Sequence, residues 1–224
     1  MKLLAGGELT ILLLLTTLLH FAPIAQVASA QIRNVDQTQV ISIPRGRPAF
    51  IDGKVSPKEW DDSRRLEITI GPNWKIPVRF KHDDKNMYFL FERVTNNGER
   101  LFPELFFDAH DQKDLQWKKG YWWFHVSANL CESEGAPNIY RRDGVFKCAH
   151  HKSGWDANNP PASSDIIEIR ISFDKIGRKL ADQMRIGFAA AVTNATGDEK
   201  QVWHFWPPNA AVGSPRTWRT AVLE

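Results

Sequence analysis

The chain has 224 residues, of which 25% are charged, and a formal net charge of +3. This mild, evenly spread basicity lacks the Lys/Arg run expected of a nucleic-acid-binding protein, so we expect no nucleic-acid partner. Two cysteines are too few for a disulfide scaffold, so a hydrophobic core must supply most of the stability.

Residues 1–30 have the pattern of a secretory signal peptide. Lys2 gives a positive start, residues 11–24 form a short apolar run, and Ala28-Ser29-Ala30 is a small-residue cleavage box. We therefore expect cleavage after Ala30 and a secreted or periplasmic protein, with an uncleaved membrane anchor as the alternative. No later stretch is long and apolar enough to span a bilayer, so we expect no membrane span in the mature chain.

Residues 31–48 are polar and are expected to form an N-terminal extension that ends in a short edge strand at Ile41 and Ile43. The domain proper is expected over residues 49–224. A capping box near its start, in which Ser56 is the N-cap, predicts one short helical turn.

From residue 66 onward, the sequence consists of short runs in which apolar and polar residues alternate. A hairpin is predicted over residues 77–94, and residues 121–130 are predicted to form one long strand. Further strands are predicted at 103–108, 166–173, 185–193, 201–205 and 218–223. Roughly nine short strands joined by turns indicate an all-β fold, an antiparallel β-sandwich or jelly roll with short helical turns.

Residues 131–155 have the character of an insertion, in which Asp143-Gly144 is a hairpin-turn signal. Export into an oxidising compartment favours a disulfide between Cys131 and Cys148 at the base of this insertion. The bond would close a loop of about 17 residues and contribute about 3 kcal/mol to stability. A metal site formed by the two cysteines, with His150 and His151 close by, is the less favoured alternative.

One predicted strand carries two acids, Glu104 and Asp108. Side chains alternate along an extended chain, so these acids share one face with Phe106. Leu105 and Phe107 share the other face and are predicted to be core residues. We expect any function to lie on the face that carries the acids and in the loops around it.

The order of motifs resembles that of the family 9 carbohydrate-binding modules and their DOMON-like relatives. The matching segments are Ile51-Asp52-Gly53 with Trp60, and residues 78–88, 104–108, 167–173, 186–188 and 215–223. The resemblance covers about residues 50 to 223. It implies a β-sandwich that binds carbohydrate without catalysis of its own and that accompanies enzymes of polysaccharide degradation.

The resemblance also implies a role for Glu104, which matches a residue that hydrogen-bonds a terminal sugar in this family. His125 on the next predicted strand stands where an Arg is expected. The family clamps its sugar between two Trp rings, but residues 96–103 and 210–213, where these rings are expected, contain no Trp.

Sugar binding needs flat aromatic faces for the C–H patches of the ring and planar polar groups for its hydroxyls. We therefore hypothesise a rebuilt platform in which Trp123, Trp155 or Trp206 surrounds Glu104 and His125. The expected partner is a poly- or oligosaccharide.

Other functions stay open at this point. Glu104 and Glu168 would be the acid and nucleophile of a glycosidase, but the resembled family is non-catalytic, so we expect no enzyme. A b-type haem would need axial ligands, and the candidates are Met87, Met184, His110, His125 and His204. A structural sandwich at the cell envelope with a degenerate site is a third reading.

A structural Ca²⁺ is a further expectation to test. Asp108, His110 and Asp111 lie close together at a strand end, where carboxylate oxygens suit this ion. A solvated turn is the favoured alternative, and otherwise we expect neither a cofactor nor a metal.

Overall fold

The computed structural model describes residues 40–116, 118–127, 130–135, 142–147, 154–158, 164–180, 184–194 and 201–224. The predicted signal peptide and Cys148 lie outside these residues, so cleavage, export and the disulfide stay predictions. Within the described ranges, none of the helices has the length and apolar character needed to cross a membrane.

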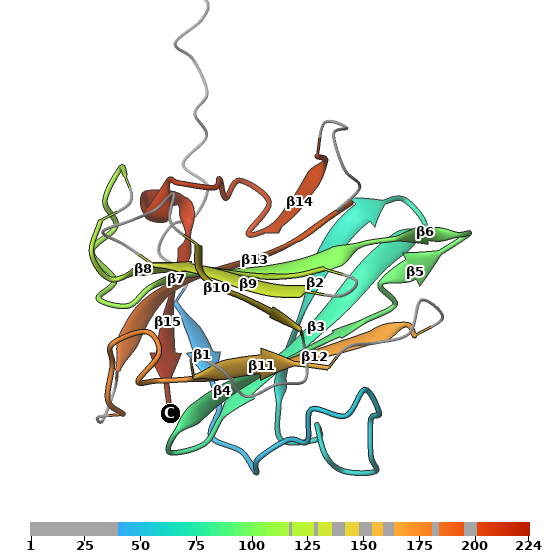
Figure 1. Ribbon diagram of the computed structural model, residues 1–224, viewed down its shortest axis with the longest axis horizontal. Coiled ribbons are helices and arrows are strands. Elements are labelled where there is room, and N and C mark those ends of the chain that lie inside the picture. The colour runs from blue at the N-terminus through green and yellow to red at the C-terminus, as the bar shows by residue number, and fades with distance from the viewer. Residues whose placement is uncertain are drawn as a thin grey trace, which may run out of the picture. The chain divides into compact units, whose positions relative to one another are not determined.

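The fold is all-β, as predicted, and consists mainly of two stacked sheets (Figure 1). The larger sheet has the order β1-β15-β13-β7-β8-β9-β10, and β14 also pairs with β13. Its strands are β1 (Ile41–Ile43), β7 (Phe102–Asp108), β8 (Tyr121–Val126), β9 (Leu130–Gly135), β10 (Arg142–Lys147), β13 (Arg185–Thr193), β14 (Trp203–Trp206) and β15 (Arg219–Leu223). A 3₁₀ turn, η1 (Pro215–Thr217), precedes β15.

The smaller sheet has the order β11-β12-β4-β3-β2. Its strands are β2 (Arg64–Gly71), β3 (Trp74–His82), β4 (Asn86–Glu92), β11 (Trp155–Ala157) and β12 (Ile166–Ser172). The predicted hairpin over residues 77–94 is confirmed, because β3 and β4 pair in antiparallel fashion. A separate two-stranded ribbon contains β5 (Thr95–Asn96) and β6 (Glu99–Arg100).

The inner faces of the two sheets share one core, because each strand directs alternate apolar side chains inward. Phe107 and Phe188 of the larger sheet lie with their ring centroids 5.6 Å apart. Phe89 of the smaller sheet lies 5.8 Å from Phe107 and 5.6 Å from Phe188, so three buried rings join the sheets. Leu105 also belongs to this core, as its alternation with Glu104 predicted.

Residues 44–63, which we call the N-terminal loop, cover part of the outer face of the smaller sheet. Trp60 of this loop is buried against Tyr88 and Leu90 of β4. Lys81 of β3 lies beneath the loop, fully buried, with its Nζ 2.8 Å from Asp62 Oδ1. The same ammonium donates to the carbonyl of Glu59, so a buried charge is paired and hydrogen-bonded.

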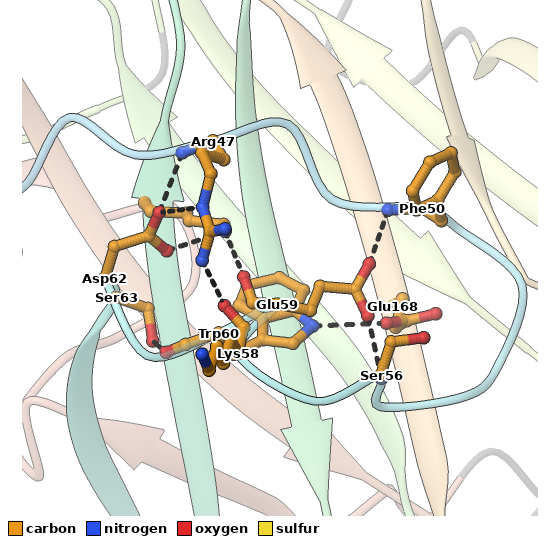
Figure 2. A network of polar contacts seen from close by, with 10 residues as sticks. Arg47, Phe50, Ser56, Lys58, Glu59, Trp60, Asp62, Ser63 and Glu168 are labelled. Carbon is orange, nitrogen blue, oxygen red and sulfur yellow. Dashed lines mark hydrogen bonds and ion pairs between the residues drawn. The ribbon is translucent and has the colours of Figure 1, made fainter.

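Glu168 of β12 fixes the other side of the loop (Figure 2). Its Oε2 accepts hydrogen bonds from the backbone N–H groups of Gly53 (2.8 Å) and Asp52 (3.1 Å). Its Oε1 accepts a bond from Trp60 Nε1 at 3.3 Å, which Figure 2 draws. One carboxylate from the sheet therefore holds both the Asp-Gly turn and the Trp of the loop.

One half of the predicted capping box is present, the bond between the Ser56 N–H and the Glu59 side chain, and the chain does not continue into a helix there. Glu59 Oε2 accepts a hydrogen bond from the backbone N–H of Ser56 at 3.0 Å, while its own N–H donates to the Ser56 carbonyl. Its Oε1 accepts from the Phe50 N–H at 2.7 Å, as Figure 2 also shows. The result is a single closed turn on the loop.

Two predictions about residues 121–155 are wrong. The expected long strand over 121–130 is divided into β8 and β9, which pair with each other in antiparallel fashion. The Asp143-Gly144 signal marks a register shift inside β10 rather than a hairpin turn. Gly is favoured both in hairpin turns and in β-bulges, so the residue types alone do not show which of the two forms here.

The Ile41 and Ile43 alternation predicted an edge strand, and this strand is β1. It pairs in parallel with β15, with Ile41 opposite Ala221 and Ile43 opposite Leu223. Both isoleucines are buried in the main core, so the sheet includes residues ahead of position 49.

Candidate functional site

The outer face of the larger sheet brings Glu104 and His125 together. Strand register places Ala191 opposite Glu104, Glu104 opposite His125, and His125 opposite Glu132. Directly opposed residues point to the same side of a sheet, so these side chains form one row across β13, β7, β8 and β9. Trp123 lies two positions before His125 and therefore points outward beside the same row.

Glu104 is the centre of a buried hydrogen-bond cluster and is only 1% exposed. His125 Nδ1 lies 2.6 Å from its Oε1, and the Thr193 hydroxyl donates to the same oxygen at 3.0 Å. Trp123 Nε1 donates to Oε2 at 2.6 Å. Burial raises the pKa of Glu104, while the His125 charge and these three donors oppose that effect.

Aromatic rings surround this cluster on the outer face. Trp203 and Phe205 of β14 stack with their ring centroids 5.6 Å apart and their planes 11° apart. Phe106 lies beneath them, 6.1 Å from Trp203 and 6.0 Å from Phe205. Trp123 belongs to the same apolar cluster, and it is partly exposed, as are the two stacked rings. We call Glu104, Trp123, His125, Trp203 and Phe205 the Glu104 face.

The structure places Trp155 in the core, so its expected exposure at a ligand platform is wrong. Trp155 lies in β11 rather than in a loop and is 2% exposed. Its ring meets Phe124 of the larger sheet edge-on at 5.1 Å. It therefore fills space between the two sheets and is not part of the Glu104 face.

Trp206 is also absent from the Glu104 face. It pairs with Ala190, whose side chain points into the main core, and its ring lies 5.9 Å from Phe188. Along β14 the side chains alternate, so Trp206 turns inward while Phe205 turns outward.

The platform predicted from the sequence left out three residues that the structure places on this outer face: Thr193, Trp203 and Phe205. The alternation of residues 203–206 shows that Trp203 and Phe205 share a face. It does not show which face is buried, because that depends on pairing with β13, where Thr193 lies opposite Trp203.

The two acids of the imagined glycosidase pair lie on different sheets. Glu104 is bonded on the outer face of the larger sheet, and Glu168 holds the N-terminal loop on the outer face of the smaller sheet. The shared core separates them. A glycosidase needs both carboxyl groups on one bound sugar, about 5–10 Å apart, so this pair does not meet that requirement.

The haem alternative fits the packing poorly. Met87 is fully buried and Met184 is 3% exposed, and both belong to the main core cluster between the sheets. His125 lies on the other side of the larger sheet, with its Nδ1 engaged by Glu104. Haem ligation by either methionine would require opening the core.

At the end of β7, Asp108 accepts hydrogen bonds within a turn and Asp111 forms ion pairs. Asp108 accepts the backbone N–H groups of His110 (3.1 Å) and Lys113 (2.9 Å). Asp111 lies 2.9 Å from Lys113 Nζ and 3.6 Å from Arg185 Nε. Over the residues that the structure describes, no group of three or more His, Cys, Asp or Glu side chains is arranged to hold a metal ion.

The sequence matches no protein-family model and no curated protein. The solved structures with a similar fold include two carbohydrate-binding modules. One is a family 9 carbohydrate-binding module from Caldicellulosiruptor kristjanssonii in complex with cellotriose, with a TM-score of 0.59 and 16% identity, covering 83% of this chain and 94% of that chain. The other is a family 9 module from the same organism in complex with glucose, with a TM-score of 0.56 and 16% identity, covering 83% and 96%. The chain thus has a fold similar to that of the family 9 carbohydrate-binding modules.

Proposed function

We propose that this chain is an exported, non-catalytic carbohydrate-binding protein that binds an oligosaccharide on the Glu104 face. The observation that carries the proposal is the hydrogen-bonded cluster of Glu104, His125 and Trp123 beside the partly exposed rings of Trp203 and Phe205. The similar fold of modules whose structures hold cellotriose and glucose supports it.

In this proposal the aromatic rings make the contact and Glu104 positions them. Flat rings pack against the C–H patches of a pyranose. Glu104 is too deeply buried to reach a ligand, but it fixes the ring of His125 through Nδ1 and that of Trp123 through Nε1. Side chains held in place before the ligand arrives lose less conformational entropy on binding.

The proposal extends to the setting of the protein. A chain exported by its predicted signal peptide would meet polysaccharide outside the cytoplasm. There it would hold the polymer near the enzymes that degrade it, without cleaving it itself.

Replacing Trp203 with Ala is expected to weaken binding at least about tenfold, or about 1.4 kcal/mol, because a stacking ring is lost. Affinity electrophoresis of the wild type against a panel of soluble polysaccharides would first identify a retaining glycan. Phe50→Ala is the matched control, because Phe50 is 74% exposed on the N-terminal loop and lies outside the Glu104 face. Equal retention of Trp203→Ala and the wild type on every bound glycan would refute the proposed site.

Glu104→Gln is expected to weaken binding by a similar factor while the domain stays folded. Gln presents an N–H₂ group that competes with the donors of His125 and Trp123, so both rings lose their fixed positions. Near-UV circular dichroism checks the fold, and the same electrophoresis checks retention. A folded Glu104→Gln protein with unchanged retention would exclude the positioning role of Glu104.

A further inference from the structure

A cavity lies on the smaller sheet. Its volume is about 160 Å³, and it is lined by Asn86, Gly154, Trp155, Asp156, Arg170 and Ser172. Strand register places Asn86 opposite Ser172 and Asp156 opposite Arg170, so β4, β12 and β11 bring these side chains together. Ser172 and Arg170 alternate with core isoleucines along β12, which puts the cavity on the outer face of the smaller sheet.

The charges that line the cavity cancel. Asp156 is 3% exposed, and one guanidinium contacts both its oxygens: Arg170 Nε lies 3.0 Å from Oδ1, and Arg170 Nη2 lies 3.0 Å from Oδ2. Asn86 and Ser172 are neutral. The lining therefore attracts neither an anion nor a metal cation strongly, and it suits a neutral polar ligand.

Two lining side chains have hydrogen-bonding capacity left over. Asn86 uses its Nδ2 for long bonds to Tyr88 Oη (3.3 Å) and Asp83 Oδ1 (3.5 Å), and its Oδ1 accepts no bond within the described part of the chain. Ser172 Oγ accepts the backbone N–H of Lys175 at 3.2 Å, and its own hydrogen finds no acceptor among the same residues. The cavity thus offers one acceptor and one hydroxyl donor.

Gly154 keeps the space beside Ser172 open. A Cβ at this position would lie 2.9 Å from Ser172 Oγ, and the backbone has a φ of +78°, where other residues are strained. The glycine therefore allows the chain to pass close to the hydroxyl without covering it.

We propose that this cavity binds one neutral sugar residue, independently of the Glu104 face. One ordered water needs about 10–15 Å³ of such volume, so the cavity is roughly tenfold too large for a single water. It is smaller than a typical drug-sized pocket of about 300–1,000 Å³. A pyranose offers adjacent hydroxyl groups that both donate and accept, which matches Asn86 Oδ1, the Ser172 hydroxyl and the planar Asp156–Arg170 pair.

The test is a titration of the purified, ¹⁵N-labelled chain followed by NMR. With D-glucose as the probe, we expect saturable shifts of the Asn86 side-chain amide and of the Lys175 backbone N–H, which contacts Ser172. Sodium glucuronate and inorganic phosphate are expected to give at least fivefold weaker responses. Absence of saturable shifts with glucose, or an equal response to the two anions, would overturn the proposal.

Three variants separate this site from the Glu104 face. Ser172→Ala is expected to weaken the glucose response about five- to tenfold, because it removes one hydrogen bond to the ligand. Ser172→Thr keeps the hydroxyl and is expected to retain binding. Glu104→Gln is expected to leave the shifts of Asn86 and Lys175 unchanged even where it abolishes polysaccharide retention. A Ser172→Ala protein that titrates like the wild type, or loss of these shifts in Glu104→Gln, would contradict a separate site.

Discussion

Replacing Glu168 with Ala is expected to lower the free energy of unfolding by about 3 kcal/mol. The change leaves three donors without their acceptor, namely the N–H groups of Asp52 and Gly53 and the Trp60 indole. Of these donors the Trp60 indole is buried, and an orphaned buried donor costs about 1–3 kcal/mol. The two backbone N–H groups are only partly buried, so water relieves part of their loss. Urea unfolding followed by Trp fluorescence measures the loss.

The same carboxylate gives stability a pH dependence of defined sign. Burial and the nearby charge of Glu59 raise the pKa of Glu168 from its ordinary 4.5 to about 7, although Gly53, Trp60 and Asp52 donate hydrogen bonds to it. Between these two values the folded state binds one more proton than the unfolded state. Stability therefore falls as pH rises from 4.5 to 7, by at most about 1.4 kcal/mol per pH unit from this group.

Glu168→Gln is the control for the pH effect, because it keeps one acceptor oxygen and cannot ionise. Its unfolding free energy is expected to fall less steeply with rising pH than that of the wild type. Burial also raises the pKa values of Glu104 and Asp108, so part of the slope stays in the variant. Identical slopes in the two proteins would show that Glu168 does not carry the extra proton.

Trp155→Ala is expected to destabilise the domain by about 3–5 kcal/mol and to leave polysaccharide retention unchanged in the protein that stays folded. The ring is buried between the sheets against Phe124, so its removal leaves a cavity that the sheets cannot fill by small movements. Trp155→Phe keeps most of the volume and is expected to cost less.

Thermal unfolding of the two Trp155 variants and affinity electrophoresis below their transitions check both halves of this prediction. A small loss of stability together with a large loss of retention would indicate that Trp155 contacts the ligand, and would contradict its place in the core.

Alternation within each strand was enough to predict the fold class and much of the core. Ile167, Ile169 and Ile171 of β12 point inward as their spacing requires, and so do Leu105 and Phe107 of β7. The reason is that one residue of slippage would move a whole apolar set to solvent. Glu104 was placed on the outer face by the same argument.

The ligand platform was harder to predict, because it depends on which strands become neighbours. The local sequence around Trp155, which includes Gly154, is compatible both with exposure to solvent and with packing against a second sheet. Alternation puts Trp203 and Trp206 on opposite faces, but only their partners Thr193 and Ala190 on β13 show which of the two faces the core. These pairings join residues distant along the chain, and local pattern carries no information about them.

The parallel pairing of β1 with β15 also sets how the domain resists a mechanical pull. Opposite forces applied at Ile41 and at Leu223 act along the axes of two strands that run in the same direction. The hydrogen bonds between them are then loaded together in shear rather than opened one after another. The unfolding rate under such tension would depend on this short ladder, and Ile43 and Leu223 anchor it to the core.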